Sequence, residues 1–404
     1  MFGWLMVAAQ VTVFATVTSP VDHPFGGAVD DATVFSRDDG GGVAAAFLPD
    51  QGLAAYLGSD TVPSDIDAIA WVPPAWQSPG VSAWSAPTPY VFAFSLTANT
   101  AVDPIWAPWA ANGMIQDGDI IGLDPDGGVV PLLTEMQLAA ELGWLSGSLD
   151  VDAAALRPDG TWLLSLNDGI ETTVLGTVLD GDVLERLPGG GVGSISVWMS
   201  EAEIQGVADA ALGNPGPLGD VKGVSLDPMD GSVLLCVQSP TPDDATILTT
   251  AGGGAVWGGW TEAGWGLAGE MELDGFAAVA GEWDPVPTMT ASANSLATDD
   301  LLRLDVNGLA PDGSWWLFAG TQWSPSSVEP WGVPGVLSLD LADPLLATFV
   351  VLPGTTPTAV DGLGNSFVEV RVPPGLPVGV RIYVQGADLA WPRLTNPVPL
   401  EVTG

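Results

Sequence analysis

The chain has 404 residues, of which 49 are acidic and 8 are basic, so that its formal net charge is −41 at pH 7. A field of this sign repels nucleic acid, anionic membranes and phosphate esters, and we expect no partners of these kinds. Because 47% of the residues are hydrophobic and 18 are Trp, the composition is that of a folded chain and not of a disordered one. No apolar run is long enough to cross a bilayer, so we expect no membrane insertion.

The charge is distributed unevenly along the chain. Up to residue 291 there are 38 acidic and 4 basic residues, a balance of −34, whereas the remainder has 11 and 4, a balance of −7. Divalent cations or salt would relieve the self-repulsion of such a chain. A surface this acidic is typical of proteins from saline habitats and also of proteins with dedicated calcium sites.

Residues 1–18 allow more than one interpretation. Their apolar stretch fits a secretory signal peptide, but no basic residue precedes it, since the first one is Arg37. The alternating segment Val11-Thr-Val-Phe-Ala-Thr-Val predicts a β-strand instead, and we favour the strand. A truncated gene start is a further alternative.

A repeat organises the chain up to about residue 285. Four Asp-led segments open units of similar layout, namely Asp65-Ile-Asp-Ala-Ile-Ala, Asp150-Val-Asp-Ala-Ala-Ala, Asp220-Val-Lys-Gly-Val-Ser and the degraded Leu273-Asp-Gly-Phe-Ala-Ala-Val. Short apolar segments bounded by Gly and Pro turns follow, which predicts three or four strands per unit. A short helix closes the second unit, because Ser200 and Glu203 have the spacing of a capping box. Such units stack on their neighbours, since none buries its apolar face alone.

The two ends of this repeat are incomplete in complementary ways. The first unit at the N-terminus lacks its opening strand, and the last opening, around Phe276, lacks its unit. We therefore predict that residues 11–17 lie beside residues 276–279 and close the array into a ring, which would remove its exposed edges. The expected fold of residues 1–285 is an all-β, propeller-like repeat array of about four or five blades.

A second domain is predicted over residues 292–404, after a linker that starts at Asp284-Pro-Val-Pro. Seven short segments with alternating apolar residues predict a β-sandwich. They begin at residues 301, 315, 336, 347, 366, 380 and 398.

Both parts resemble a group of uncharacterised secreted bacterial proteins. Three segments are similar to the C-terminal β-sandwich of that group. They are Asp361-Gly-Leu-Gly-Asn-Ser-Phe-Val-Glu-Val, Pro374-Gly-Leu-Pro-Val-Gly-Val-Arg-Ile-Tyr-Val-Gln-Gly and Leu394-Thr-Asn-Pro-Val. The Asp-x-Asp-Ala openings with their Asp-Gly turns are similar to its propeller-like repeats. The resemblance implies an exported protein, extracellular or on the cell surface, and it implies no activity.

Few side chains are available for metal or nucleophilic chemistry. The single His23 and the single Cys236 cannot build a zinc site, and no Gly-x-Ser-x-Gly nucleophile motif is present. The glycine runs lack the lysine that follows a phosphate-binding loop. We expect Cys236 to be buried in a strand and His23 to lie on a surface loop.

Carboxylates carry the remaining chemistry. The acids of Asp65-Ile-Asp67 and of Asp150-Val-Asp152 stand two residues apart, so on a strand each pair shares one face. If these strands lie innermost, the four side chains could ring a channel and hold Ca²⁺, which prefers hard oxygen ligands. The alternative, which we favour, is that the first Asp of each pair caps a turn. Lys222 replaces the second acid in the third copy, which weakens a symmetric metal ring.

Aromatic residues give a second lead to a ligand. The first unit has an insertion over residues 71–116, and Trp76, Trp84, Trp106 and Trp109 lie in it among prolines. Flat aromatic faces on such a loop could stack on sugar rings or grip a proline-rich chain. The alternative is an insertion that folds on its own hydrophobic patch.

The sequence favours binding over catalysis. We expect an exported surface or extracellular binding or adhesion protein whose ligand is a glycan or another surface polymer. One alternative is a calcium-dependent propeller hydrolase acting on sugars or lactones. The other is a structural surface-layer or matrix protein.

Overall fold

The computed structural model is mostly β-structure and describes most of the chain. The described residues are 11–17, 21–22, 28–29, 33–38, 45–48, 53, 57, 65–72, 91–102, 107, 109–110, 113–123, 129–213, 215–238, 245–258, 260–261, 265, 273–280, 288–293, 295–297, 300–307, 309, 312–320, 323–326, 337–339, 358–361, 365–372, 376–388, 393–395 and 398–403.

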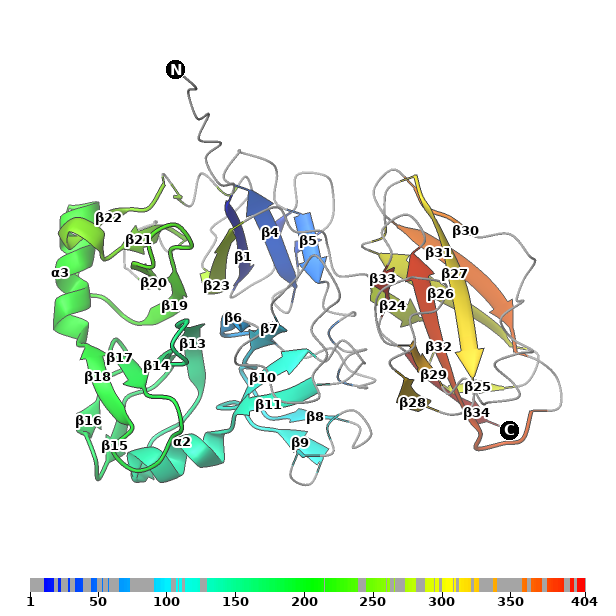
Figure 1. Ribbon diagram of the computed structural model, residues 1–404, viewed down its shortest axis with the longest axis horizontal. Helices are drawn as coiled ribbons and strands as arrows, with labels where there is room; N and C mark the ends of the chain where they lie inside the picture. Colours follow the sequence, from blue (N-terminus) through cyan, green and yellow to red (C-terminus); the bar gives the residue numbers. More distant parts are fainter. Residues whose placement is uncertain are drawn as a thin grey trace, which may run out of the picture.

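Four antiparallel sheets of four strands each form the main body of the described part before residue 281 (Figure 1). Sheet one has the order β23 (Leu273–Ala280), β1 (Val11–Val17), β4 (Val34–Asp38) and β5 (Ala45–Leu48). Sheet two has β6 (Ile69–Val72), β7 (Val91–Phe94), β10 (Ile120–Leu123) and β11 (Val129–Leu133). Sheet three has β13 (Val151–Leu156), β14 (Trp162–Leu166), β17 (Val183–Arg186) and β18 (Ile195–Met199). Sheet four has β19 (Val221–Leu226), β20 (Val233–Val237), β21 (Ile247–Thr249) and β22 (Ala255–Val256).

The predicted pairing of the two ends of the repeat is confirmed. Strand β1 pairs antiparallel with β23, and Ala15 stands opposite Phe276 in the register. The segment from Val11 to Val17 is therefore a strand of sheet one, with Phe14 and Val17 fully buried. Two segments more than 250 residues apart in sequence thus complete one sheet.

The first strand of every sheet lies at the centre of this part. These four inner strands, β6, β13, β19 and β23, contact one another, as Figure 1 shows. Hydroxyl groups link adjacent sheets there: Thr16 Oγ1 donates to the Ile66 carbonyl at 3.0 Å, and Ser95 Oγ donates to the Val151 carbonyl at 2.6 Å. Ser225 Oγ accepts the Ala278 N–H at 2.9 Å. Thr16 lies on β1 and Ser95 directly follows β7, the second strands of sheets one and two, so a hydroxyl group at this point links each of these two sheets to the next one.

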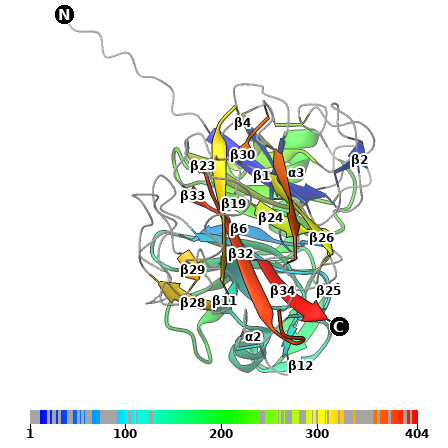
Figure 2. The same cartoon turned by 90° about the vertical axis from the view of Figure 1, so that its right-hand side faces the viewer.

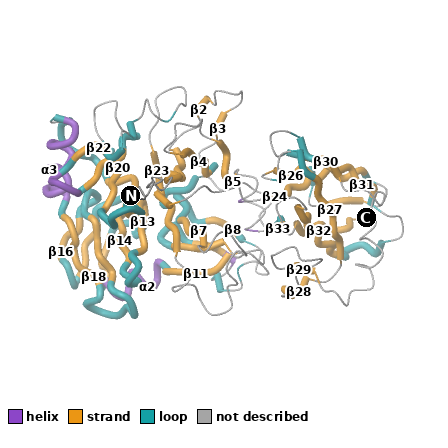
Figure 3. Tube along the Cα trace, turned by 45° about the horizontal axis from the view of Figure 1, so that its top comes forward, coloured by secondary structure: helices purple, strands orange, loops and turns teal. Residues whose placement is uncertain are grey.

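Two α-helices among the described residues follow the last strands of sheets two and three. They are α2 (Glu135–Leu142) and α3 (Glu201–Leu212), and both lie outside the sheets in Figure 3. Thr134 and Ser200 begin them with capping boxes, as the sequence predicts for Ser200. Neither helix is long and apolar enough to cross a membrane.

Most of the described strands from residue 288 onward belong to two larger sheets, and this part of the chain lies toward the viewer in Figure 2. One has the order β24 (Thr288–Ala291), β26 (Leu301–Asn307) and β31 (Ser366–Arg371). The other has the order β25 (Ser295–Ala297), β34 (Val398–Thr403), β32 (Arg381–Asp388), β27 (Ser314–Gly320) and β30 (Thr358–Ala359), and β33 (Arg393–Leu394) pairs with β32. Residues of both sheets share one buried cluster that includes Met289, Leu304, Trp315, Val384 and Val402. The strand predicted to begin at residue 347 and the linker at residue 284 lie outside the described residues.

Short strands complete the described β-structure. Three two-stranded pairs are present, β2 (Val21–Asp22) with β3 (Ala28–Val29), β8 (Thr100–Ala101) with β9 (Met114–Ile115), and β28 (Trp323–Ser326) with β29 (Leu337–Leu339). A three-stranded sheet has the order β12 (Trp144–Ser146), β15 (Ile170–Thr172) and β16 (Gly176–Val178). The 3₁₀ turn η3 (Ala251–Gly253) precedes β22.

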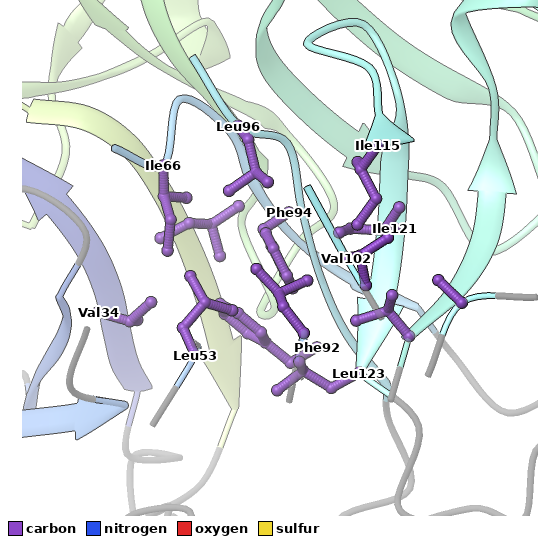
Figure 4. Close-up of a cluster of buried hydrophobic side chains, with 14 of the residues drawn as sticks. Val34, Leu53, Ile66, Phe92, Phe94, Leu96, Val102, Ile115, Ile121 and Leu123 are labelled. Atoms are coloured by element: carbon purple, nitrogen blue, oxygen red, sulfur yellow. The ribbon is translucent and has the colours of Figure 1, made fainter. Parts of the chain in front are cut away.

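A hydrophobic cluster between sheets one and two also reaches the second group of sheets. Figure 4 shows its centre, where Val34, Leu53, Ile66, Phe92 and Phe94 converge. Phe318, Tyr383 and Ala387, from β27 and β32, belong to the same buried cluster. The two parts of the chain therefore share buried apolar surface.

Candidate metal centre

The acids at the start of the inner strands come together in one cluster. Asp65 and Asp67 precede β6, and Asp150 and Asp152 stand at the start of β13. Asp220 directly precedes β19, and Lys222 is the second residue of that strand. Asp274 is the second residue of β23. We call these seven residues the inner-strand cluster. Because the inner strands lie side by side and each carries an acid at or near its start, the packing of the sheets brings six carboxyl groups and one ammonium into the same region.

Three of these carboxylates are arranged closely enough for one ion. Asp65, Asp67 and Asp274 each offer an oxygen, and these oxygens lie within 4.8 Å of one another. Oxygen ligands sit about 2.3–2.6 Å from Ca²⁺, so two oxygens on opposite sides of one ion are about 5 Å apart. The spacing therefore fits a single calcium-sized ion between sheets one and two.

Lys222 neutralises the other side of the cluster. Its Nζ lies 3.2 Å from Asp152 Oδ2, 3.4 Å from Asp220 Oδ2 and 3.9 Å from Asp274 Oδ1. Burial alone would lower the pKa of Lys222, but Asp152, Asp220 and Asp274 together raise it, so the ammonium stays charged. The repeat position that carries Asp in the first two copies thus carries an internal cation in the third.

Burial raises the pKa values of several carboxyl groups in the inner-strand cluster. Asp67 is only 3% exposed. Desolvation is the largest cause that raises the pKa of its carboxyl group, and repulsion by Asp150 and Asp152 raises it further. Desolvation, followed by repulsion from Asp152, raises the pKa of Asp220 to about 8. Desolvation also raises the pKa of Asp150, and this carboxyl group lies within hydrogen-bonding reach of Asp67. Without a bound cation the cluster therefore retains protons at neutral pH.

Some of the cluster oxygens have no donor. Asp67 Oδ2 and Asp150 Oδ1 are buried, and no N–H or hydroxyl group in the described part of the chain donates to them. Burial of such acceptors costs free energy unless a donor or a cation satisfies them. The donor set around Asp67, which is made only of carboxylate oxygens, is the chemistry that a hard divalent cation requires.

The first Asp of two openings also accepts a hydrogen bond from the backbone of its own segment. Asp65 Oδ1 accepts the N–H of Ile66 at 2.8 Å, and Asp220 Oδ1 accepts the N–H of Val221 at 2.7 Å. For Asp65 capping and membership of the cluster go together, because each carboxylate oxygen has more than one lone pair.

The structure adds residues that the sequence pattern did not select as ligands. Asp274 joins Asp65 and Asp67, whereas Asp150 and Asp152 lie beside the group and face Lys222 or Asp67. The signal for Asp274 was its place in the degraded fourth opening, which aligns with Asp67 and Asp152 in the repeat.

Asp119 and Asp182, which stand at the same position in the first two units of the repeat, have a structural role. Asp119 Oδ1 accepts the Glu135 N–H at 2.8 Å, and Asp182 Oδ1 accepts the Glu201 N–H at 2.8 Å. Both carboxylates therefore anchor the first turn of a helix, α2 or α3, where negative charge is favourable. These repeated acids need no ligand to explain them.

Trp109, one of the four tryptophans predicted to bind a ligand, packs inward. Trp109 is half-buried against the hydrophobic cluster of Figure 4, and its Nε1 donates to the Val129 carbonyl at 2.9 Å. Trp76, Trp84 and Trp106 lie outside the described residues.

Comparisons with known proteins assign no family. No protein-family model matches the sequence, and no curated protein matches it. Among solved structures, Salmonella alpha-2-macroglobulin reacted with methylamine is similar at 11% identity over 98% of this chain and 25% of that chain, with a TM-score of 0.22. The native conformation of E. coli alpha-2-macroglobulin is similar at 10% identity over 98% of this chain and 38% of that chain, also with a TM-score of 0.22. This chain spans well under half of either protein, and a likeness this weak says nothing about fold or function.

Proposed function

We propose that sheets one to four are the blades of a four-bladed β-propeller and that the last two large sheets form a β-sandwich. Three features support the propeller: the central position of the inner strands, the repeated hydroxyl links between sheets, and the joining of both ends of the repeat in sheet one. A closed ring leaves no exposed sheet edge at the centre.

We further propose that the inner-strand cluster binds one Ca²⁺ ion through Asp65, Asp67 and Asp274. The observation that carries this proposal is the buried Asp67 Oδ2, to which no N–H or hydroxyl group of the described residues donates. Asp67 is only 3% exposed. A divalent cation supplies the missing partner and offsets the repulsion among six acids that a single ammonium balances only in part.

The proposed ion would join the two sheets that close the ring. Asp65 and Asp67 precede β6 of sheet two, and Asp274 belongs to β23 of sheet one. Calcium bound there would hold β23 against β6, and its role would be to stabilise the closed arrangement. Calcium sites of extracellular modules have dissociation constants of about 10⁻⁴–10⁻³ M, which suits an exported protein.

The function that fits such a site is calcium-stabilised binding outside the cell, with a glycan or another surface polymer as the ligand. The hydrolase alternative needs acids that a substrate can reach, but Asp67, Asp152 and Asp274 are each at most 3% exposed. A structural surface-layer role would use the same calcium site and differs only in lacking a polymer ligand.

Isothermal titration calorimetry with CaCl₂ tests the calcium site. We expect one saturable ion per chain for the wild type, and at least about tenfold weaker binding for Asp67→Asn, because the amide removes a charged ligand. The matched control is Asp230→Asn, since Asp230 is an exposed turn acid whose Oδ1 accepts the Ser232 N–H at 2.8 Å. Equal affinity of the wild type and Asp67→Asn would show that the cluster is not the calcium site.

Polymer binding is tested by retention on insoluble polysaccharides. If the insertion is a binding platform, the double variant Trp76→Ala/Trp84→Ala should lose retention while its melting temperature stays within about 2 °C of the wild type. Trp109→Ala is the control for a packing role, and it should cost about 3 kcal/mol of stability because this indole packs on the core. A double variant that melts several degrees earlier would assign Trp76 and Trp84 to the core as well.

A further inference from the structure

A second site lies at the opposite ends of the inner strands. A cavity of about 640 Å³ opens beside residues 70–71, 154–159, 225–228 and 277–279, toward the C-terminal end of each inner strand. The acids of the inner-strand cluster stand at the N-terminal ends of the same strands and do not line it. Small-molecule pockets have volumes of about 300–1,000 Å³, so the cavity has room for a ligand.

Small side chains on the strands create this space. Six of the residues that line it are small, namely Ala70, Ala154, Ala155, Ala277, Ala278 and Ser225, and larger apolar residues such as Leu156, Leu226 and Val279 line the rest. Protein interiors are close-packed, and larger residues at these positions would fill the centre. The sequence therefore leaves an apolar space of ligand size where the four sheets meet.

One aromatic ring borders the cavity in a fixed position. The Trp71 indole packs on Phe14 with ring centroids 5.0 Å apart and on Phe92 with centroids 5.7 Å apart. It is half-buried and lines the cavity. A ring held this way presents a face to apolar groups and to organic cations.

The charges at the mouth are predominantly negative. Asp159 and Asp227 line the cavity together with Arg157. The guanidinium of Arg157 is already paired with Glu185 at 2.6 Å and lies over the Trp198 ring at 5.2 Å. Asp227 is fixed by the Trp257 Nε1–H at 2.6 Å and by the Met229 N–H at 2.7 Å.

The negative charge of Asp159 is retained at neutral pH. The backbone N–H of Thr161 donates to Asp159 and lowers the pKa of that carboxyl group. Asp159 and Asp227 therefore line the cavity beside Arg157, whose guanidinium is already paired with Glu185. With the net charge of −41 on the chain, an anionic ligand is repelled and a cationic one is attracted.

We propose that this cavity binds a small organic ammonium compound, with its alkyl or aryl body against the alanine wall and Trp71 and its ammonium group between Asp159 and Asp227. The proposal is independent of the calcium site, because different residues at the other ends of the strands form it.

Three probes of one shape and different charge test the ligand class. Benzylamine, benzyl alcohol and benzoate are each titrated into the full chain at pH 7, and binding is followed by ligand-observed NMR and calorimetry. We expect the affinity for benzylamine to exceed that for benzyl alcohol at least about fivefold, and we expect no binding of benzoate. Saturable benzoate binding, or no saturable benzylamine binding, overturns the proposal.

Variants locate the binding. Ala154→Leu fills the cavity and should weaken benzylamine binding at least about tenfold, with Ala278→Leu as a second filling variant if the first does not fold. Asp159→Asn should weaken it about fivefold, whereas Asp230→Asn, at the matching turn of the next repeat but not lining the cavity, should leave it unchanged. Asp67→Asn should also leave it unchanged, since a loss there would place the ammonium in the inner-strand cluster and overturn the proposal. Benzylamine binding that is unaffected in a folded cavity-filling variant overturns it too.

Discussion

Ca²⁺ at 10 mM is expected to raise the melting temperature of this protein by roughly 5 to 10 °C, and to raise it more at pH 8 than at pH 5. If the dissociation constant is about 10⁻⁴ M, this concentration is 100 times that constant, and it stabilises the state that binds Ca²⁺ by about 2.7 kcal/mol. For a domain of this size each kcal/mol corresponds to about 2–4 °C in melting temperature.

The dependence on pH follows from the buried carboxyl groups. Their unfolded pKa is about 4, whereas burial and neighbouring acids raise the pKa of Asp67 and raise that of Asp220 to about 8 in the folded protein. Between these values the folded chain binds more protons than the unfolded chain, so the free energy of unfolding of the metal-free protein falls as the pH rises. Ca²⁺ binds the deprotonated carboxylates, so its own stabilising effect increases over the same range.

Differential scanning calorimetry at pH 5 and pH 8 measures this effect, with CaCl₂, EGTA and NaCl of matched ionic strength. Repulsion among surface acids also makes added salt raise the melting temperature, and the NaCl sample measures this part of the effect. Asp67→Asn should lose most of the difference between CaCl₂ and NaCl, and Asp230→Asn should keep it. If NaCl matches CaCl₂ in the wild type, calcium acts only as a counterion. If neither salt changes the melting temperature, repulsion among the acids does not limit the stability of the folded protein.

Replacing Gly275 by Ala is expected to destabilise the protein by about 3 kcal/mol, because the added methyl group overpacks the contact between two inner strands. A Cβ on Gly275 in β23 would lie 2.7 Å from the carbonyl oxygen of Asp67 and 3.1 Å from the backbone nitrogen of Ile69. These are backbone atoms of the neighbouring sheet, and they cannot rotate away as a side chain can. Strand β23 must therefore shift away from β6, which also separates Asp274 from Asp67 and should weaken Ca²⁺ binding at least about tenfold.

Gly206→Ala is the matched control for this substitution. Gly206 lies within helix α3 and a Cβ there would meet nothing within 4 Å. Both variants lose one glycine and gain one methyl group, so they restrict the unfolded chain equally. Gly206→Ala should stabilise the protein by about 1 kcal/mol. Urea denaturation and calcium titration of both variants make the comparison. Wild-type stability of Gly275→Ala would mean that β23 is not held against β6, and the closed arrangement of four sheets would be wrong.

The sequence alone determined the elements that depend on local chemistry. Alternating apolar residues between Gly and Pro turns predicted strands such as β13 and β14, and Ser200 with Glu203 predicted the start of α3, because both patterns act within a few residues. The repeat also predicted the pairing of β1 with β23, since two incomplete ends of one pattern complete each other.

The composition of the candidate site depended on contacts that no local pattern contains. The sequence singled out Asp65, Asp67, Asp150 and Asp152 as two equal pairs, but the distances between strands group Asp65 and Asp67 with Asp274. Lys222, which weakened the idea of a symmetric ring, lies within 3.4 Å of Asp152 and Asp220 and balances them, so that the asymmetry is part of the site.

Only the tertiary structure decided where the chain has empty space and which charges meet. The alanines of β13 and β23 read as ordinary strand residues, yet at the centre of four sheets they border a cavity of about 640 Å³. The shifted pKa values of the inner-strand acids have the same origin, because desolvation and repulsion depend on neighbours brought from four separate segments. A sequence specifies side chains and their local periodicity, whereas burial and through-space distance exist only once the sheets have packed.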